Sequence, residues 1–150
     1  MLMFLENITM SLQAALLLPM IGMIFLTFGI MAWMLKLRYQ AVLKDGLNPR
    51  YFKLYKGEKL PEYLVKVTQH YENLLEMPVF FYVAVLLLIA LKISDPFYVV
   101  LSWVFFLTRL LHTYIHTTNN KVKQRKNVFI VSTLVLMILW VRICIDVLSL

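Results

Sequence analysis

Residues 12–35 read LQAALLLPMIGMIFLTFGIMAWML and contain no charged side chain. About 20 apolar residues in a helix cross the ~30 Å hydrocarbon core of a bilayer, and a helix pairs its backbone polar groups internally. Three further apolar stretches follow at residues 74–91, 97–114 and 128–148. The sequence therefore predicts an all-α integral membrane protein, with a single four-helix transmembrane domain that occupies residues 1–150.

The composition supports the same fold class. Apolar residues make up 61% of the chain and charged residues 15%, whereas soluble domains have about 45–50% and 25%. The first stretch is too long for the core of a cleavable signal peptide, and Glu6 lies where such a signal carries positive charge. We therefore expect this stretch to stay in the membrane. The single cysteine, Cys144, excludes a disulfide within the chain.

The positions of lysine and arginine predict how the chain lies in the membrane. The connection between the first two stretches and the connection between the last two are both basic, whereas the amino terminus and the second connection are not. Because basic loops stay in the cytoplasm, we expect loops one and three there and both termini outside. The net charge of +7 is then a topology signal beside membrane lipids, and we expect no nucleic-acid partner.

Local signals place two helix ends outside the apolar stretches. Gly46, followed by Asn48 and Pro49, is typical of the end of a helix, and Pro61 is typical of a first turn. The first and second helices are therefore expected to extend beyond the bilayer on the cytoplasmic side. Pro78 removes a helical hydrogen bond, so we expect a bend beside it.

Two polar strings occur at the edges of the middle stretches, NLLEMP at residues 73–78 and RLLHTYIH at residues 109–116. An ionisable group at membrane depth costs about 2.5–3.5 kcal/mol on insertion scales, so such groups mark a functional site by default. These two strings are therefore the candidate site.

Helical geometry groups the polar side chains into two faces. At about 100° per residue, Arg109, His112 and His116 share one face of the third helix, and Asn73 and Glu76 share one face of the second. Both faces lie toward the cytoplasmic ends of their helices, so they can meet. We expect an ion pair between Glu76 and Arg109, although a purely structural role for such a pair stays open.

A metal site is the main alternative to this ion pair. His112 and His116 are four residues apart and can point at one ion, with His70 and Glu76 as further ligands. However, membrane di-iron hydroxylases have many more histidines, and haem usually needs histidines on facing helices. We therefore expect no metal.

Other kinds of catalytic site have weaker support. The serines at positions 94, 102, 132 and 149 are not in the glycine-flanked turn of a nucleophilic serine. The chain also has no glycine-rich loop that could bind a phosphate. A serine hydrolase or a nucleotide-binding site is therefore not expected.

The order and spacing of these features resemble the MAPEG family, the membrane-associated proteins in eicosanoid and glutathione metabolism. The features are a basic first loop, Asn-x-x-Glu-x-Pro at 73–78, Arg-x-x-His-Thr at 109–113 and a basic turn that leads to Arg125. The likeness covers the whole chain, and the two polar strings look most like an uncharacterised bacterial branch. A bacterial inner membrane is therefore the expected location.

The resemblance implies a homotrimer that binds glutathione as a cosubstrate between adjacent subunits, near the cytoplasmic surface. It also implies a transferase or peroxidase that acts on a hydrophobic small molecule arriving through the bilayer. Arg125 matches the arginine that stabilises the glutathione thiolate in that family. The residues that would bind the tripeptide are Lys36, Arg38, Asn73, Glu76, Arg109, His112 and His116.

The chain departs from the eicosanoid branch of that family at five positions. Gln69 and Glu72 stand where those members have arginines that bind carboxylates of glutathione, and His116, Lys126 and Phe129 replace two tyrosines and a serine. A carboxylate in place of a guanidinium repels an anionic group. Two alternatives therefore stay open, a different anionic or lipidic ligand and a non-enzymatic membrane scaffold.

Overall fold

In the computed structural model, helices are the only regular secondary structure of the described residues. The structure describes the backbone of 2–54, 59–93 and 95–149 and the side chains of 11–53, 59–93 and 95–149. The helices are α1 (Leu2–Leu43), α2 (Tyr51–Leu54), α3 (Glu62–Ala90), α4 (Pro96–Thr117) and α5 (Val122–Leu148).

Four of these helices are long and apolar enough to cross a membrane: α1 from Ser11 onward, α3, α4 and α5. Large apolar side chains are exposed along their outer faces, with Phe25 at 70% and Leu134 at 51%. Such surfaces suit lipid rather than water. The predicted fold class, a four-helix membrane bundle, is confirmed.

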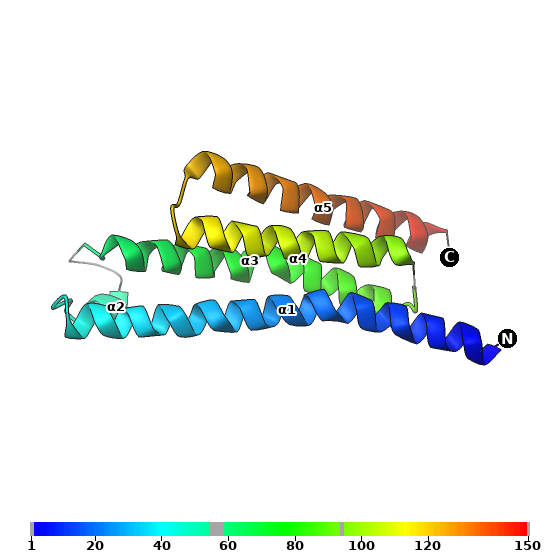
Figure 1. Ribbon diagram of the computed structural model, residues 1–150, viewed down its shortest axis with the longest axis horizontal. Coiled ribbons are helices and arrows are strands. Elements are labelled where there is room, and N and C mark those ends of the chain that lie inside the picture. Colours follow the sequence, from blue (N-terminus) through cyan, green and yellow to red (C-terminus); the bar gives the residue numbers. More distant parts are fainter. Residues whose placement is uncertain (1, 55–58, 94, 150) are drawn as a thin grey trace.

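The four long helices lie lengthwise beside one another, with α3 and α4 between α1 and α5 (Figure 1). Within the described ranges, α1 contacts α3 and α4, α5 contacts the same two helices, and α1 does not contact α5. Both termini lie at one end of the bundle. The α1–α3 and α4–α5 connections lie at the opposite end, which we call the loop end.

At the loop end of the bundle, the boundaries of α1 and α3 agree with the sequence prediction. The first helix ends at Leu43, and Gly46 adopts a positive φ of 71° in the turn that follows, a conformation that glycine tolerates best. Pro61 directly precedes α3. The helix continues through Pro78, although this proline leaves the carbonyl of Leu74 without its helical donor.

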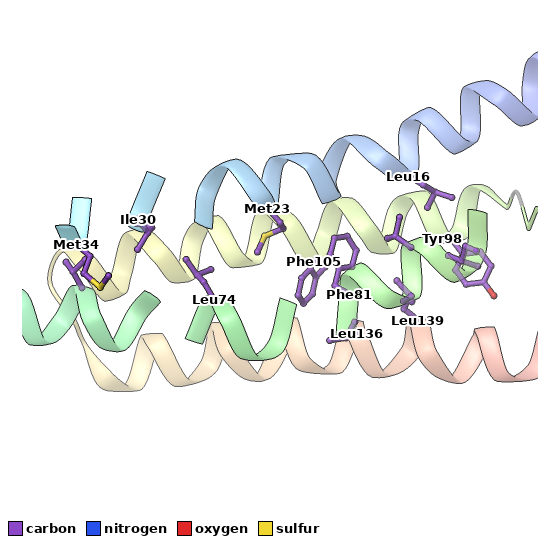
Figure 2. Close-up of a cluster of buried hydrophobic side chains, with 14 of the residues drawn as sticks. Leu16, Met23, Ile30, Met34, Leu74, Phe81, Tyr98, Phe105, Leu136 and Leu139 are labelled. Atoms are coloured by element: carbon purple, nitrogen blue, oxygen red, sulfur yellow. The ribbon is translucent and has the colours of Figure 1, made fainter. Parts of the chain in front are cut away.

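Aromatic rings from the two central helices fill the middle of the bundle (Figure 2). Phe81 of α3 and Phe105 of α4 are fully or almost fully buried, and their ring centroids are 4.6 Å apart in a stacked arrangement. Met23 of α1 and Leu136 of α5 are buried in the same cluster. All four long helices therefore share one core.

A glycine permits the close approach of α1 and α4. A Cβ atom at Gly22 would lie 2.7 Å from Cζ of Phe106, whereas a Cβ atom at Gly29 would meet nothing within 4 Å. Small residues have this role at many contacts between membrane helices. The Phe106 ring therefore occupies the space that a side chain at position 22 would need.

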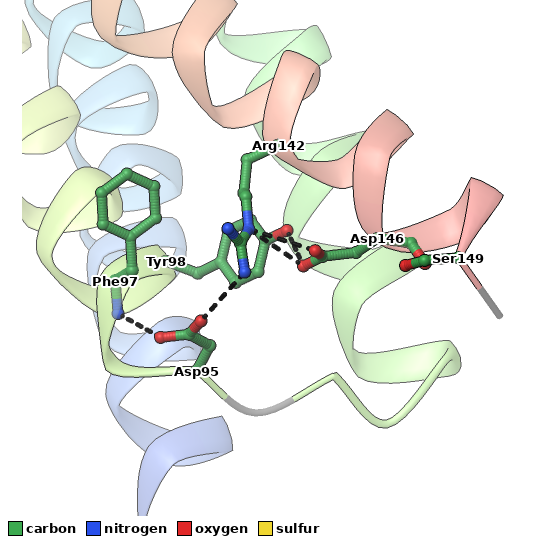
Figure 3. Close-up of polar contacts among 6 residues, drawn as sticks. All are labelled: Asp95, Phe97, Tyr98, Arg142, Asp146 and Ser149. Carbon is green, nitrogen blue, oxygen red and sulfur yellow. Dashed lines mark hydrogen bonds and ion pairs between the residues drawn. The ribbon is translucent and has the colours of Figure 1, made fainter.

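A polar network joins α4 to α5 at the terminal end (Figure 3). Nε of Arg142 lies 3.1 Å from Oδ1 of Asp146, and its Nη2 lies 3.7 Å from Oδ2 of Asp95. The buried Tyr98 donates its hydroxyl to Oδ2 of Asp146 at 2.6 Å. Asp95 also accepts a hydrogen bond from the backbone of Phe97, which caps α4. The network fixes the start of α4 against the end of α5.

Candidate functional site

An open cleft of about 300 Å³ lies where α3, α4 and α5 meet near the loop end. Three of the predicted site residues line it, namely Asn73, His112 and Arg125. The remaining lining residues are Val122, Lys126 and Phe129. The cleft thus combines cationic, amide and imidazole groups with an apolar wall.

The turn between α4 and α5 positions Arg125. Asn120 adopts a positive φ of 48°, a conformation that asparagine tolerates better than most residues, and α5 begins two residues later. Nη1 of Arg125 donates to Oδ1 of Asn120 at 2.9 Å and lies 3.1 Å from Nε2 of His116. The guanidinium is therefore held between the end of α4 and the start of α5, at the edge of the cleft.

Arg109 is fully buried behind the cleft. Its Nη2 donates to the backbone carbonyl of Asn73 at 3.2 Å, and its guanidinium lies 5.8 Å from the centroid of the Phe129 ring. Its Nε and Nη1 have no hydrogen-bond partner in the described part of the chain. These two buried donor nitrogens of Arg109 are thus without an acceptor among the described residues, whereas buried donors are usually paired with an acceptor.

The predicted ion pair between Glu76 and Arg109 is wrong within one chain. The described residues contain no such pair, and the Glu76 side chain is exposed. The cause is the rotation of α3 about its axis. His70 and Leu74 are the buried residues of this segment, and Glu76 follows Leu74 by about 200° around the helix. It therefore points away from α4.

Three histidines form a buried cluster next to Arg109 and Arg125. The ring centroids of His70, His112 and His116 are 5.1–5.7 Å apart, and all three side chains are buried. His112 and His116 are among the predicted site residues, whereas His70 is predicted only as a possible metal ligand. His70 lies three residues before Asn73, on nearly the same face of α3. This spacing is the signal that could have placed His70 among the predicted site residues.

Lys36 and Arg38 do not line the cleft of their own chain. The Lys36 side chain is exposed, and the Arg38 guanidinium lies 5.3 Å from the centroid of the Phe52 ring. Arg38 and Phe52 belong to a different cavity, of about 340 Å³, near the end of α1. The resemblance assigned this region to the cleft of a neighbouring subunit, so its role stays a prediction about the assembly.

The departures from the eicosanoid branch fall into two groups in the structure. Gln69 and Glu72 are exposed on α3. Lys126 and Phe129 line the cleft itself, and His116 lies beside Arg125. The differences from that branch therefore include residues that line the cleft as well as residues outside it.

Comparison with known families identifies the chain. The profile of the MAPEG family matches residues 16–145. The chain belongs to the MAPEG family. The matched range includes all the residues that line the cleft of this MAPEG protein. A search of curated proteins and a search of solved structures found no match. Membership supports a membrane-bound, glutathione-related transferase or peroxidase as the general class.

Proposed function

We propose that this MAPEG protein is a glutathione-dependent transferase or peroxidase that acts on hydrophobic electrophiles. The observation that carries the proposal is the convergence of Asn73, His112 and Arg125 on one cleft near the loop end. These residues come from three different helices, and they are residues for which the family resemblance implies contact with glutathione.

Arg125 stabilises the thiolate of glutathione in this proposal. The thiolate rather than the thiol is the nucleophile, and an adjacent fixed cation favours its formation. Arginine suits this role because it does not give up its own proton. The hydrogen bonds to Asn120 and His116 start from Nη1, so they orient the guanidinium at the edge of the cleft.

The chemistry begins when the glutathione thiol releases its proton to water. In conjugation, the sulfur attacks an electrophilic carbon, a sulfur–carbon bond forms, and the leaving group departs with its electron pair. In peroxide reduction, the sulfur attacks one oxygen of the O–O bond and the other oxygen leaves as an alcohol after protonation. A second glutathione then releases water and forms the disulfide.

The remaining residues of the cleft would bind the two substrates. Asn73 and His112 would contact the tripeptide, and the apolar side chains of Val122 and Phe129 suit the hydrophobic substrate. The residues assigned to the tripeptide that do not line the cleft are Lys36, Arg38, Glu76, Arg109 and His116. Of these, Lys36, Arg38 and Glu76 would act across a subunit boundary.

The exposure of Glu76 supports self-association, and the family resemblance implies that the assembly is a homotrimer. This carboxylate lies within a helix that can span a membrane, next to the exposed side chains of Leu75, Val79 and Phe80. A carboxylate that faces lipid is costly, and a second copy of the chain can cover it and supply a cation. We expect native mass spectrometry from mild detergents to give a trimer. A monomer in every mild detergent would contradict this assembly.

The proposed membrane orientation follows from the basic residues. The even number of spans puts both termini on one side, and the positive loops put that side outside the cytoplasm. The cleft near the loop end would then lie at the cytoplasmic surface of a bacterial inner membrane, where glutathione is available.

A second candidate is a MAPEG protein whose cleft binds a different anionic or lipidic ligand. Glu72 favours it, because a carboxylate in place of an arginine repels a carboxylate of glutathione. The Glu72 side chain is exposed, so this repulsion would be partly screened by solvent. A membrane scaffold without a ligand is the third alternative.

Calorimetric titration with glutathione separates these candidates. We expect the solubilised protein to bind the tripeptide with a dissociation constant of millimolar or below, and to conjugate it to a small hydrophobic electrophile. Absence of binding at millimolar glutathione would favour the second candidate. Binding of neither glutathione nor anionic lipid would favour the scaffold.

A further inference from the structure

The three histidines come from two helices and meet in the interior of the bundle. His70 is 0% exposed, His112 2% and His116 1%. One ring nitrogen from each lies within 4.8 Å of the others. These are all the histidines of the chain, so its whole imidazole content is gathered at one place.

Most of the ring nitrogens in this cluster lack a hydrogen-bond partner. Nδ1 of His70, both nitrogens of His112 and Nδ1 of His116 are buried without one in the described ranges. Buried polar atoms are usually paired. Three imidazoles that each bring one ring nitrogen into one space are the donor set that zinc and similar transition metals prefer.

The hydrogen bonds of His70 fix which nitrogen is available. The Thr113 hydroxyl donates its single proton to the carbonyl of Arg109 at 2.8 Å, so its oxygen accepts from Nε2 of His70, which lies 2.9 Å away. Nε2 therefore carries the proton, and Nδ1 has a free lone pair. Metal-bound histidines usually donate their second nitrogen to such a partner.

We propose that His70, His112 and His116 bind one zinc-like divalent metal ion. Three protein ligands leave a fourth position open, and one of the three ligands, His112, also lines the cleft. Ligand nitrogens around tetrahedral zinc are about 3.4 Å apart, so the rings must turn or move inward by roughly an ångström. Glu76 is not a ligand, because it points away from the cluster.

The neighbouring arginines determine what completes the site. Arg109 and Arg125 both lie beside the histidines, and a dication between two guanidiniums requires an anion in the fourth position. Nη1 of Arg125 lies within hydrogen-bond distance of Nε2 of His116. Since arginine can only donate, Nε2 of His116 is the acceptor in this hydrogen bond. The metal and Arg125 therefore compete for His116.

The sequence alone suggests His70 as a further ligand beside His112 and His116 but does not show that it reaches them. No metal was expected because di-iron hydroxylases have many more histidines and haem usually needs histidines on facing helices. The third ligand, His70, lies 42 residues before His112 on another helix, and the packing of α3 against α4 brings it in. The metal site would share His112 with the proposed glutathione contact, and the test of the metal site needs no glutathione.

Cobalt titration tests the metal site. The protein is produced without a polyhistidine tag, since a tag would add imidazoles, and is titrated with Co²⁺ in detergent. We expect one cobalt per chain, with the visible absorption bands of a tetrahedral ion, and displacement by zinc. His70→Gln is expected to abolish the bands without affecting glutathione binding. Absence of the bands in the wild-type protein would overturn the proposal.

Two further variants test the ligand environment. Thr113→Val removes the partner of His70, so cobalt affinity is expected to fall by about 10- to 100-fold. Arg125→Met removes a competing donor and a positive charge, so cobalt affinity is expected to rise. Unchanged bands in a variant with all three histidines replaced by glutamine would show binding elsewhere and overturn the proposal. If His70→Gln does not fold, as judged by its circular dichroism, the Thr113→Val and Arg125→Met pair decides.

Discussion

Replacement of Arg125 by leucine is expected to lower the conjugation rate of a small hydrophobic electrophile by ~10² or more, the scale of one lost electrostatic stabiliser. The ultraviolet absorbance of the bound thiolate is expected to disappear as well. Glutathione affinity is expected to fall less, because Asn73 and His112 would still contact the tripeptide. Stopped-flow absorbance and calorimetry measure these effects separately.

Lys126→Ala is the matched control for Arg125→Leu. Lys126 lines the same cleft, follows Arg125 in the same turn of α5 and carries the same charge. It has none of the hydrogen bonds that orient Arg125. If the two variants lose the same activity, or neither loses any, Arg125 does not stabilise the thiolate and serves only as an anchor at the lipid headgroups.

Replacement of Phe81 by alanine is expected to cause a large loss of stability. Phe→Ala costs about 3–5 kcal/mol in soluble proteins, from transfer to water and from the cavity. In a membrane protein the lipid is as apolar as the core, so mainly the cavity and the lost ring stacking remain. We therefore expect a loss of about 2–3 kcal/mol, measured by thermal unfolding in a mild detergent.

The control for Phe81→Ala is Phe25→Ala. This ring is 70% exposed on α1, whereas Phe81 is fully buried and stacks on Phe105. The same atoms are removed, but no cavity forms inside the bundle. Equal destabilisation by both changes would mean that the stack at the centre is not what holds the helices together.

The fold could be predicted because its signals are local. Long apolar runs specify membrane helices without reference to the rest of the chain, and Gly46 and Pro61 act on their own turns. The polar face of α4 was also predictable, because Arg109, His112 and His116 share it through the helical period alone.

The contacts between helices could not be predicted in the same way. Asn73 and Glu76 fit one face of α3 equally well, but only packing against α4 decides which of them points inward. In the structure, the half-buried Asn73 lines the cleft while Glu76 is exposed. The place of His70 beside His112 depends on the same packing.

The polarity of α4 has a consequence for the insertion of the protein into the membrane. Among the four long helices, the most apolar 18-residue stretch is least hydrophobic in α4 and most hydrophobic in α5. An arginine near the centre of an inserted helix costs about 2.5–3.5 kcal/mol at the translocon, and α4 carries Arg109 together with two histidines. Because only a short turn joins α4 to α5, the two helices can enter the bilayer as one hairpin. We therefore expect retention of α4 in the membrane to depend on the synthesis of α5.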